Sequence, residues 1–411
     1  DGSVGGLVVA LDGTIMKWTS KNGAETFSGI KNGTYVLTEA SSPEGYAYAA
    51  DIEFTINSDG TLTTNADTAN DENGNVVLQI EDPALHFKIS KTDLTGEEEV
   101  AGATLEVRNS SGEVVDSWTS VAGQVYDFGS KLTAGETYTL VETVAPQGYA
   151  YTTDIEFTVN KDGSIETELS TTVDADGNTV YLVKDTALQL QLNKVELGSG
   201  NEVSGATMVV YDSEQNEITR WTSEAGTTHE FGHLLHAGET YTLVETVAPQ
   251  GYAYTTDIEF TVNKDGSITT DASITQDENG NKILLVEDSK LHFNVNKIDL
   301  TTEEEVAGAT LEVRDSEGNT VDSWTSDGIN TYDFGDKLYA GQSYTLIETV
   351  APQGYAYTTA IEFTVNEDGT IVTGMKATSD ADGNVTYLVE DEKLHFHISK
   401  VDVTDGKEVA G

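Results

Sequence analysis

The sequence contains no cysteine, only five prolines, and 21 lysine and arginine residues against 71 aspartate and glutamate residues. The absence of cysteine excludes a disulfide scaffold and a cysteine-ligated zinc site. The formal net charge of −50 argues against binding to nucleic acid or to an anionic membrane surface, because phosphate groups would be repelled. No apolar run approaches the roughly 18 residues of a membrane helix, so we expect no membrane insertion. No signal peptide precedes Asp1, which predicts a mature protein or an excerpt of one.

The chain is built from a repeated segment. Residues 137–152 return almost unchanged at 240–255 and 343–358, and a weaker copy lies at 34–48. A glutamate recurs in the four copies at a constant spacing of 103 residues: Glu39, Glu142, Glu245 and Glu348. A unit of that length can bury its own core. We therefore predict four units at 1–84, 85–187, 188–290 and 291–393, followed by a further first strand at 394–411.

Short runs with alternating apolar and polar residues predict an all-β chain, since helical spacing is hard to find. The turns SDG, KDG, KDG and EDG recur at 58–60, 161–163, 264–266 and 367–369, each between two strand-like runs, which is typical of hairpins. About seven or eight strands per unit indicate a β-sandwich. The short connections between units leave little room for bending, so we expect tandem sandwiches arranged as a rod.

In each unit the recurring glutamate faces the core. Strand alternation places Glu142 on the same face as Tyr138, Leu140 and Val144. A carboxylate among apolar side chains is costly unless it is neutral, paired or used chemically. Alternation predicts the same inward direction for two further sets of residues. These are the aspartates Asp82, Asp185, Asp288 and Asp391, and the lysines Lys91, Lys194, Lys297 and Lys400.

Two interpretations of a buried lysine, glutamate and aspartate stay open. The first is a buried salt bridge with a spare acid, although two acids and one base leave an unmatched group in low dielectric. The second is a reaction, because burial disfavours charge on both amines and carboxyl groups. A neutral amine is a nucleophile, and it can attack the aspartate carbonyl carbon while the protonated glutamate stabilises developing charge and relays protons. The product is an amide and one water, formed in a single turnover rather than by an enzyme.

The combination of K-x-D, G-A-T-L-E-V, E-T-x-A-P-x-G-Y and a terminal aspartate resembles the Cna-B or SpaA-like domains of Gram-positive surface adhesins and pilins. The resemblance implies an Ig-like, transthyretin-like sandwich with a self-formed isopeptide bond, located extracellularly on a bacterial surface. The implied bonds, each with its assisting glutamate, are Lys91–Asp185 with Glu142, Lys194–Asp288 with Glu245, and Lys297–Asp391 with Glu348. Many relatives use asparagine as the acceptor, whereas aspartate here makes water the leaving group.

The chain departs from this pattern at its two ends. The first unit carries Glu39 and Asp82 but no lysine strand, and the segment 394–411 is a lysine strand without its sandwich. One hypothesis is that Lys400 bonds Asp82 of a second chain with Glu39 assisting, which gives a head-to-tail fibre. The alternative is that the sequence is part of a longer tandem protein whose neighbouring domains complete both ends.

Two motifs have alternative interpretations as metal sites. The acidic turns at 71–75, 174–178, 277–281 and 380–384 resemble calcium loops but lack the twelfth-position glutamate, and they also suit tight hairpins. His229, Glu230 and His233 spell HExxH, yet the parallel repeats show a strand end and loop there rather than a zinc-binding helix. We therefore expect no metal site and no cofactor. The recurring Trp18, Trp118, Trp221 and Trp324 are interpreted as packing residues.

The function that these patterns favour is a structural stalk or pilus-like fibre on a cell surface. Its partners would be further copies of the chain or neighbouring domains. The alternative is an adhesin that binds a host extracellular matrix or glycan ligand through surface loops. Near-identical repeats favour the stalk, since a specialised binding site would make one repeat diverge.

Overall fold

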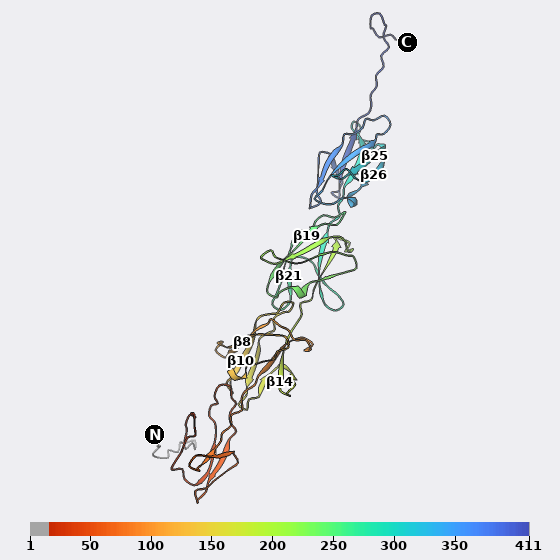
Figure 1. Cartoon of the computed structure of the whole chain (residues 1–411). Helices are drawn as coiled ribbons and strands as arrows, with labels where there is room; N and C mark the ends of the chain where they lie inside the picture. Colours follow the sequence, from red (N-terminus) through yellow and green to blue (C-terminus); the bar gives the residue numbers. More distant parts are fainter. Residues whose placement is uncertain (1–15, 411) are drawn as a thin grey trace. The chain divides into compact units, whose positions relative to one another are not determined.

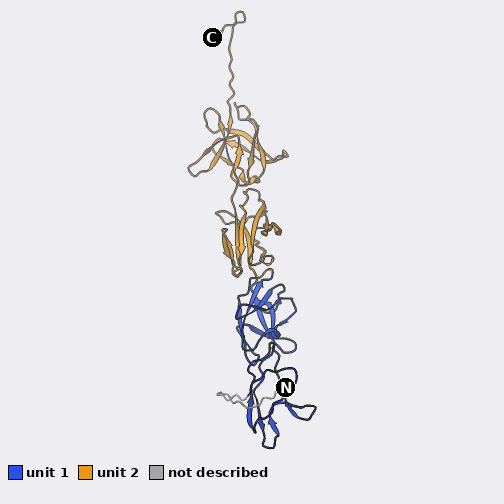
Figure 2. Cartoon of the chain, turned by 90° about the vertical axis from the view of Figure 1, so that its left-hand side faces the viewer, with its two compact units in different colours: residues 1–146, 150–186 blue, residues 147–149, 187–411 orange. Residues whose placement is uncertain are grey.

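The computed structural model describes residues 16–410, in which all regular elements are strands apart from three short 3₁₀ turns (Figure 1). The predicted all-β class is therefore confirmed. The chain divides into two compact units, one of residues 1–146 and 150–186 and one of residues 147–149 and 187–411 (Figure 2). Within residues 16–410 the structure has no apolar helix of membrane-spanning length.

The first unit contains repeat 1, of which five strands are described, and repeat 2, with nine strands and one 3₁₀ turn. The strands of repeat 1 are β1 (Gly33–Leu37), β2 (Ile52–Ile56), β3 (Leu62–Thr64), β4 (Thr68–Asn70) and β5 (Val76–Leu78). Those of repeat 2 are β6 (Lys88–Asp93), β7 (Thr104–Asn109), β8 (Val114–Thr119), β9 (Tyr126–Asp127), η1 (Gly129–Lys131), β10 (Thr137–Val144), β11 (Ile155–Val159), β12 (Ile165–Thr167), β13 (Ser170–Val173) and β14 (Thr179–Asp185).

The second unit contains repeats 3 and 4, which have the same order of elements. Repeat 3 comprises β15 (Leu190–Glu196), β16 (Thr207–Tyr211), β17 (Glu217–Thr222), β18 (His229–Glu230), η2 (Gly232–Leu234), β19 (Thr240–Val247), β20 (Ile258–Val262), β21 (Ile268–Thr270), β22 (Ile274–Gln276) and β23 (Lys282–Asp288). Repeat 4 comprises β24 (Asn294–Asp299), β25 (Ala307–Arg314), β26 (Thr320–Asp327), β27 (Tyr332–Asp333), η3 (Gly335–Lys337), β28 (Ser343–Val350), β29 (Ile361–Val365), β30 (Ile371–Thr373), β31 (Lys376–Ser379) and β32 (Val385–Asp391).

Each complete repeat is a sandwich of a five-stranded and a four-stranded sheet. In repeat 2 the larger sheet has the order β12-β11-β10-β7-β8, and its strands are all antiparallel. The smaller sheet has the order β13-β14-β6-β9, in which β6 and β14 are parallel. The first and last strands of the repeat are therefore hydrogen-bonded neighbours, although a whole domain separates them in sequence. Repeats 3 and 4 show the same parallel pair, β15 with β23 and β24 with β32.

The core of repeat 2 lies between these two sheets. Leu85, Phe87 and Ile89 alternate inward along the segment that leads into and through β6, and all three are buried. The ring of Phe87 lies 4.7 Å from that of Phe157 in the opposite sheet. Trp118 stacks on Tyr126 at 4.4 Å and packs against the core, so its predicted packing role is confirmed.

Within each compact unit, the loop with the sequence P-x-G-Y-A-Y of the first repeat contacts the second repeat. In the first unit the N–H of Gly45 donates to Leu132 O at 2.7 Å, and Ala47 is part of the repeat 2 core. In the second unit Gly251 donates to Leu338 O at 2.8 Å, and Ala253 is part of the repeat 4 core. Since a buried alanine from one repeat completes the core of the next, no flexible linker separates them.

One sequence prediction about β10 is wrong. Tyr138, Leu140 and Glu142 point inward as alternation predicts, but Val144 is 48% exposed. The register of β10 against β7 shifts between Glu142 and Val144. Such a bulge reverses the facing of the residues beyond it, so the valine leaves the core immediately after the glutamate.

Gly335, in the 3₁₀ turn η3, packs closely against the chain segment that leads into β24. A β-carbon at Gly335 would overlap the backbone carbonyl oxygen of Leu291. We therefore expect Gly335→Ala to lower the free energy of unfolding of repeat 4 by about 2–3 kcal/mol through overpacking, measured by chemical denaturation. The matched control is Gly374→Ala, where a β-carbon meets nothing within 4 Å. Equal effects of the two substitutions would contradict this account of the turn.

Candidate functional site

A lysine, a glutamate and an aspartate meet in the core of repeat 2. Lys91 Nζ contacts Asp185 Oδ1 and lies 2.9 Å from Glu142 Oε1. The three side chains are 0–1% exposed. The structure thus brings together residues from β6, β10 and β14 that the sequence analysis selected one by one.

Strand register explains why these side chains meet. In the parallel pair, Lys91 is aligned with Val183, and Asp185 follows two residues later on the same face of β14. Both side chains point toward the five-stranded sheet, from which Glu142 of β10 points back. The site therefore depends on both layers of the sandwich.

The same arrangement occurs in the other two complete repeats. Lys194 Nζ contacts Asp288 Oδ1 and lies 3.2 Å from Glu245 Oε1. Lys297 Nζ contacts Asp391 Oδ1 and lies 3.1 Å from Glu348 Oε1. All of these side chains are again 0–1% exposed.

Burial favours the neutral form of the carboxyl groups. It raises the pKa of Glu142 and of Asp185, against the opposing attraction of the lysine. Burial also raises the pKa of Glu348, and it raises that of Glu245 to about 7. A glutamic acid with such a pKa can both donate and accept a proton near neutral pH.

Each site also contains buried oxygen atoms without a hydrogen-bond partner among the described residues. Asp185 Oδ2 has none, and Glu142 Oε1 is close to Lys91 Nζ without hydrogen-bonding geometry. The equivalent atoms of repeats 3 and 4 also lack a hydrogen-bond partner among the described residues: Asp288 Oδ2, Glu245 Oε1, Asp391 Oδ2 and Glu348 Oε1. An unsatisfied buried carboxyl oxygen is costly, which makes a stable ion pair an incomplete explanation of the site.

A threonine at each site was not predicted from the sequence. Thr152 Oγ1 lies 2.8 Å from Lys91 Nζ and 2.5 Å from Asp185 Oδ1. Its counterparts are Thr255 and Thr358, whereas repeat 1 has Ala49. One sequence signal could have identified this threonine: the three complete repeats read YAYTT, whereas repeat 1 reads YAYAA.

The residues predicted for the fourth site form no ion pair with one another among residues 16–410. Glu39 and Asp82 are half-buried, and neither forms an ion pair with a lysine among residues 16–410. Lys400 is exposed, and on its segment Phe396 is 84% exposed. In the described part of the chain this segment contains no named strand. It has the isolated bridge between Val401 and Glu408, and the N–H of Leu394 donates to Gly354 O at 2.9 Å.

The other candidate motifs have local structural explanations. Asp277 Oδ1 accepts the N–H groups of Asn279 and Asn281, both at 2.8 Å, so the acidic turn uses this carboxylate itself. His229 lies in the strand β18 and stacks on Trp221 at 4.0 Å. Across residues 16–410 the structure has no group of three or more histidines or carboxylates arranged to hold a metal ion.

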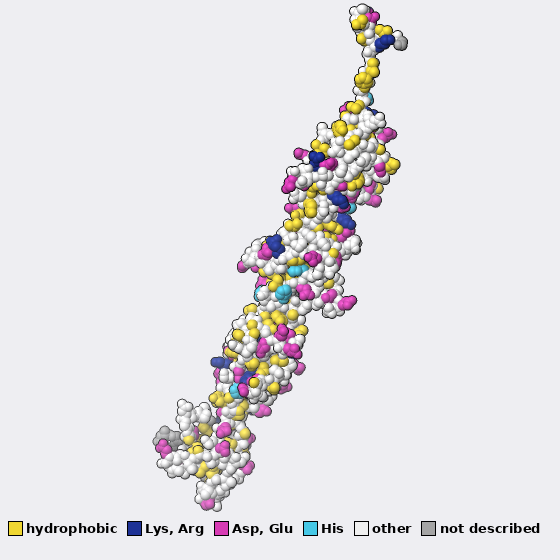
Figure 3. Space-filling model, turned by 45° about the vertical axis from the view of Figure 1, so that its right-hand side comes forward, with side chains coloured by type: hydrophobic (Ala, Val, Ile, Leu, Met, Phe, Trp, Pro, Cys, Tyr) yellow, Lys and Arg dark blue, Asp and Glu magenta, His cyan; other side chains and the backbone are white. Residues whose placement is uncertain are grey.

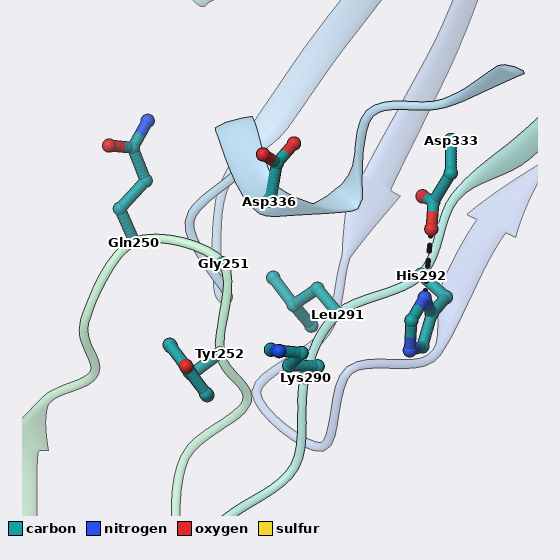
Figure 4. Close-up of a pocket in the computed structure, with 8 residues that line it drawn as sticks. All are labelled: Gln250, Gly251, Tyr252, Lys290, Leu291, His292, Asp333 and Asp336. Carbon is teal, nitrogen blue, oxygen red and sulfur yellow. Dashed lines mark hydrogen bonds and ion pairs between the residues drawn. The ribbon is translucent and has the colours of Figure 1, made fainter. Parts of the chain in front are cut away.

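A surface hollow of about 360 Å³ lies in the second unit, where the 250–252 loop faces the η3 turn (Figure 4). Tyr252 and Lys290 lie on one side of it, and His292 points toward Asp333 with Nδ1 2.8 Å from Oδ2. None of the buried lysine, glutamate and aspartate residues lines this hollow.

Comparison with known proteins identifies the class to which this architecture belongs. The model of the SpaA prealbumin-like fold domain matches residues 7–71, 85–173, 188–277 and 292–379. The chain belongs to this family and contains four copies of its domain. The Cna-B or SpaA-like resemblance and the predicted β-sandwich class are thereby confirmed.

Individual relatives are distant. Serine-aspartate repeat-containing protein F of Staphylococcus epidermidis is 25% identical over 393 residues, which cover 83% of this chain and 22% of that protein. The open conformation of the pilus adhesin SpaC from Lactobacillus rhamnosus GG is 16% identical, with 90% of this chain and 55% of that one covered and a TM-score of 0.33. The shaft pilin SpaA of the same bacterium is 11% identical, with coverages of 51% and 98% and a TM-score of 0.23. This chain thus spans about a fifth of its curated relative and about half of SpaC.

Proposed function

We propose that the chain is a structural part of a pilus or adhesin on a bacterial cell surface, and that each complete repeat is locked by a lysine–aspartate amide. The proposal of the amide rests on one observation. In three repeats a lysine Nζ contacts an aspartate carboxyl beside a glutamate, with all side chains 0–1% exposed. The names of the relatives, a pilus adhesin and a shaft pilin, support the cellular role.

The proposed reaction balances without any co-reactant. The ammonium of Lys91 and the carboxylate of Asp185 together yield one amide and one water. One proton passes from the ammonium to the aspartate carboxylate, which leaves a neutral amine to attack the aspartate Cγ. The protonated Glu142 then donates its proton to the departing oxygen and takes one from the nitrogen, so the glutamic acid is regenerated. Because the fold holds the amine and the carboxyl group in contact, their effective concentration is high enough for such a condensation. The reaction occurs once per site.

Environment distinguishes these sites from ordinary ion pairs in the same repeats. Lys393 Nζ lies 2.7 Å from Asp299 Oδ2, yet the lysine side chain is 47% exposed. The hydrogen bond from Lys393 and two backbone N–H groups hold the pKa of Asp299 well below its usual range. Because that carboxylate stays charged and both of its oxygens accept hydrogen bonds, it is a poor acceptor for an amine. Burial instead raises the pKa of Asp185.

The amide would join the first and last strands of each repeat. Lys91 and Asp185 are 94 positions apart, and closing a loop of that length stabilises a fold by about 4–5 kcal/mol in the chain-entropy account of crosslinks. The next lysine, Lys194, follows nine residues after Asp185. Tension along the chain would therefore pass from one amide to the next and bypass the interior of each repeat.

The exposed segment at 394–403 supports a second proposal, which is self-association. Its apolar residues Leu394, Phe396 and Ile398 match the buried series Leu85, Phe87 and Ile89. We propose that it pairs with β5 in repeat 1 of a second copy and brings Lys400 to Asp82 and Glu39. A neighbouring domain of a longer chain could take up the same segment.

An adhesin role through surface loops is the other candidate. Figure 3 shows acidic side chains over the surface with few lysines and arginines, and the residues that line the hollow of Figure 4 do not identify a ligand. The near-identity of the three complete sites favours the structural role.

The intact mass under denaturing conditions tests the amides. We expect a chain lighter than its sequence by three waters. Lys194→Met should reduce the loss to two waters, whereas Lys290→Met should keep all three, because Lys290 forms a surface pair with Glu196. Both variants replace one lysine of the same region by methionine, so they are matched. If the unsubstituted chain has the full mass of its sequence, no amide has formed and the sites are buried ion pairs.

The pH dependence of the reaction tests the role of the glutamate. The pKa of Glu245 is about 7, and the reactive state contains this residue protonated. The rate of amide formation in repeat 3 should therefore fall as the pH rises through about 7. It can be measured by refolding unreacted chain recovered in denaturant, quenching with acid and quantifying the crosslinked peptide. A rate that rises steadily up to pH 9 would instead indicate that only deprotonation of the lysine matters.

Covalent multiples on a denaturing gel test the self-association. Lys400→Ala should abolish them, because the nucleophile is lost. Lys407→Ala, which replaces another exposed lysine near the C-terminus that pairs with Asp405, should leave them unchanged. Dimers that persist in the first variant would eliminate the proposed bond to Asp82.

A further inference from the structure

One threonine touches all three members of each buried site. In repeat 2, Thr152 Oγ1 lies 2.8 Å from Lys91 Nζ and 2.5 Å from Asp185 Oδ1, and the N–H of Thr152 donates to Glu142 Oε2 at 2.7 Å. The hydroxyl therefore bridges the two atoms between which a proton must move. The backbone of the same residue holds the glutamate, so that its other oxygen faces the lysine.

The bridge is repeated in the other complete repeats. Thr255 Oγ1 lies 2.6 Å from Lys194 Nζ and 2.5 Å from Asp288 Oδ1. Thr358 Oγ1 lies 2.9 Å from Lys297 Nζ and 2.5 Å from Asp391 Oδ1. Both threonines also donate their N–H to the local glutamate at 2.7 Å.

Repeat 1 separates the two roles of this residue. Ala49 N–H still donates to Glu39 Oε2 at 2.7 Å, so the backbone contact does not require threonine. Only the hydroxyl is missing there. The backbone hydrogen bond therefore does not depend on the threonine side chain, whereas the contacts with the lysine and the aspartate do.

We propose that the hydroxyls of Thr152, Thr255 and Thr358 take part in amide formation as proton relays. This inference rests on the proposed function. As the nitrogen attacks the aspartate Cγ, Oγ1 accepts a proton from Nζ and passes its own proton to Oδ1. The C–Oδ1 bond then breaks and Oδ1 leaves as water. The glutamate delivers the second proton of this water and takes the second proton of the nitrogen in exchange. The threonine ends the reaction unchanged, and the nitrogen has lost the two protons that the water carries away.

The hydroxyl retains an acceptor once Oδ1 has left. Thr152 Oγ1 is 3.2 Å from the backbone oxygen of Lys184, and Thr358 Oγ1 is 2.8 Å from that of Glu390. After the reaction the hydroxyl can donate to this carbonyl, so no buried polar group is left unsatisfied by the relay. A hydroxyl suits this position because a lone pair can accept from Nζ, while its one proton can be donated first to Oδ1 and later to this carbonyl.

The test is a refolding time course of the full chain with Thr152→Val and Thr152→Ser. Valine preserves the shape of threonine and removes the hydroxyl, whereas serine keeps the hydroxyl. Unreacted chain recovered in denaturant is diluted into buffer, quenched at intervals, digested, and assayed for the crosslinked peptide of each repeat. The sites of repeats 3 and 4 in the same molecules are internal controls.

We expect Thr152→Val to slow formation of the Lys91–Asp185 bond by at least about tenfold, a modest share of what proton-transfer catalysis supplies. Thr152→Ser should restore the rate, and the other two bonds should form normally. Thr152→Ala, which copies Ala49, guards against a packing defect of valine, and protection of repeat 2 peptides from limited proteolysis reports that repeat 2 has folded. A folded Thr152→Val or Thr152→Ala chain that forms the bond as fast as its neighbouring repeats would overturn the relay.

This result is distinguishable from failure of the proposed function. If the amides do not form at all, the unsubstituted chain contains no crosslinked peptide in any repeat. If they form without help from the threonine, all three peptides are present and the substitutions leave the rates equal. A slow Thr152→Ser chain would also contradict the proposal, because it would assign the effect to the methyl group.

Discussion

The parallel pairing of the first and last strands of each repeat is the constraint on which the rest of the structure depends. It places Lys91 beside Asp185 across a sequence separation of 94 residues, with both side chains directed into the sandwich. The opposite sheet adds Glu142, and the apolar core removes water from all three. Two acids and one base in such surroundings are poorly stabilised as ions. The proposed amide removes the charges of the lysine and the aspartate and connects the ends of the domain at the same time.

The ends of the chain illustrate that burial, and not residue type, makes these groups unusual. Lys400 and the apolar residues before it repeat the pattern around Lys91, but they are exposed because no sandwich surrounds them in the described residues. Asp82 and Glu39 are correspondingly only half-buried. In the pair of Lys393 and Asp299 the aspartate is buried, but the lysine side chain is 47% exposed. Contact between an amine and a carboxylate is common, whereas contact in a dry core with a raised glutamate pKa is not.

Much of the fold and of the candidate site could be predicted because the repeats are strict. Alternation identified Lys91, Glu142 and Asp185 as inward-facing residues, and the structure places all three in the core. Alternation failed at Val144, because a bulge beside the glutamate changes the register there. It also missed Thr152, which lies in an irregular loop where side-chain direction has no period.

The sequence by itself determined the class of the fold, the number of repeats and the residue types available for chemistry. These properties follow from local periodicity, turn residues and the cost of apolar surface in water, all of which act along the chain. The pairing of the lysine strand with the aspartate strand, the bulge at the glutamate and the threonine bridge were decided only by the tertiary structure. Each depends on backbone hydrogen bonds and contacts between segments far apart in sequence, for which no local pattern sets the partner or the register.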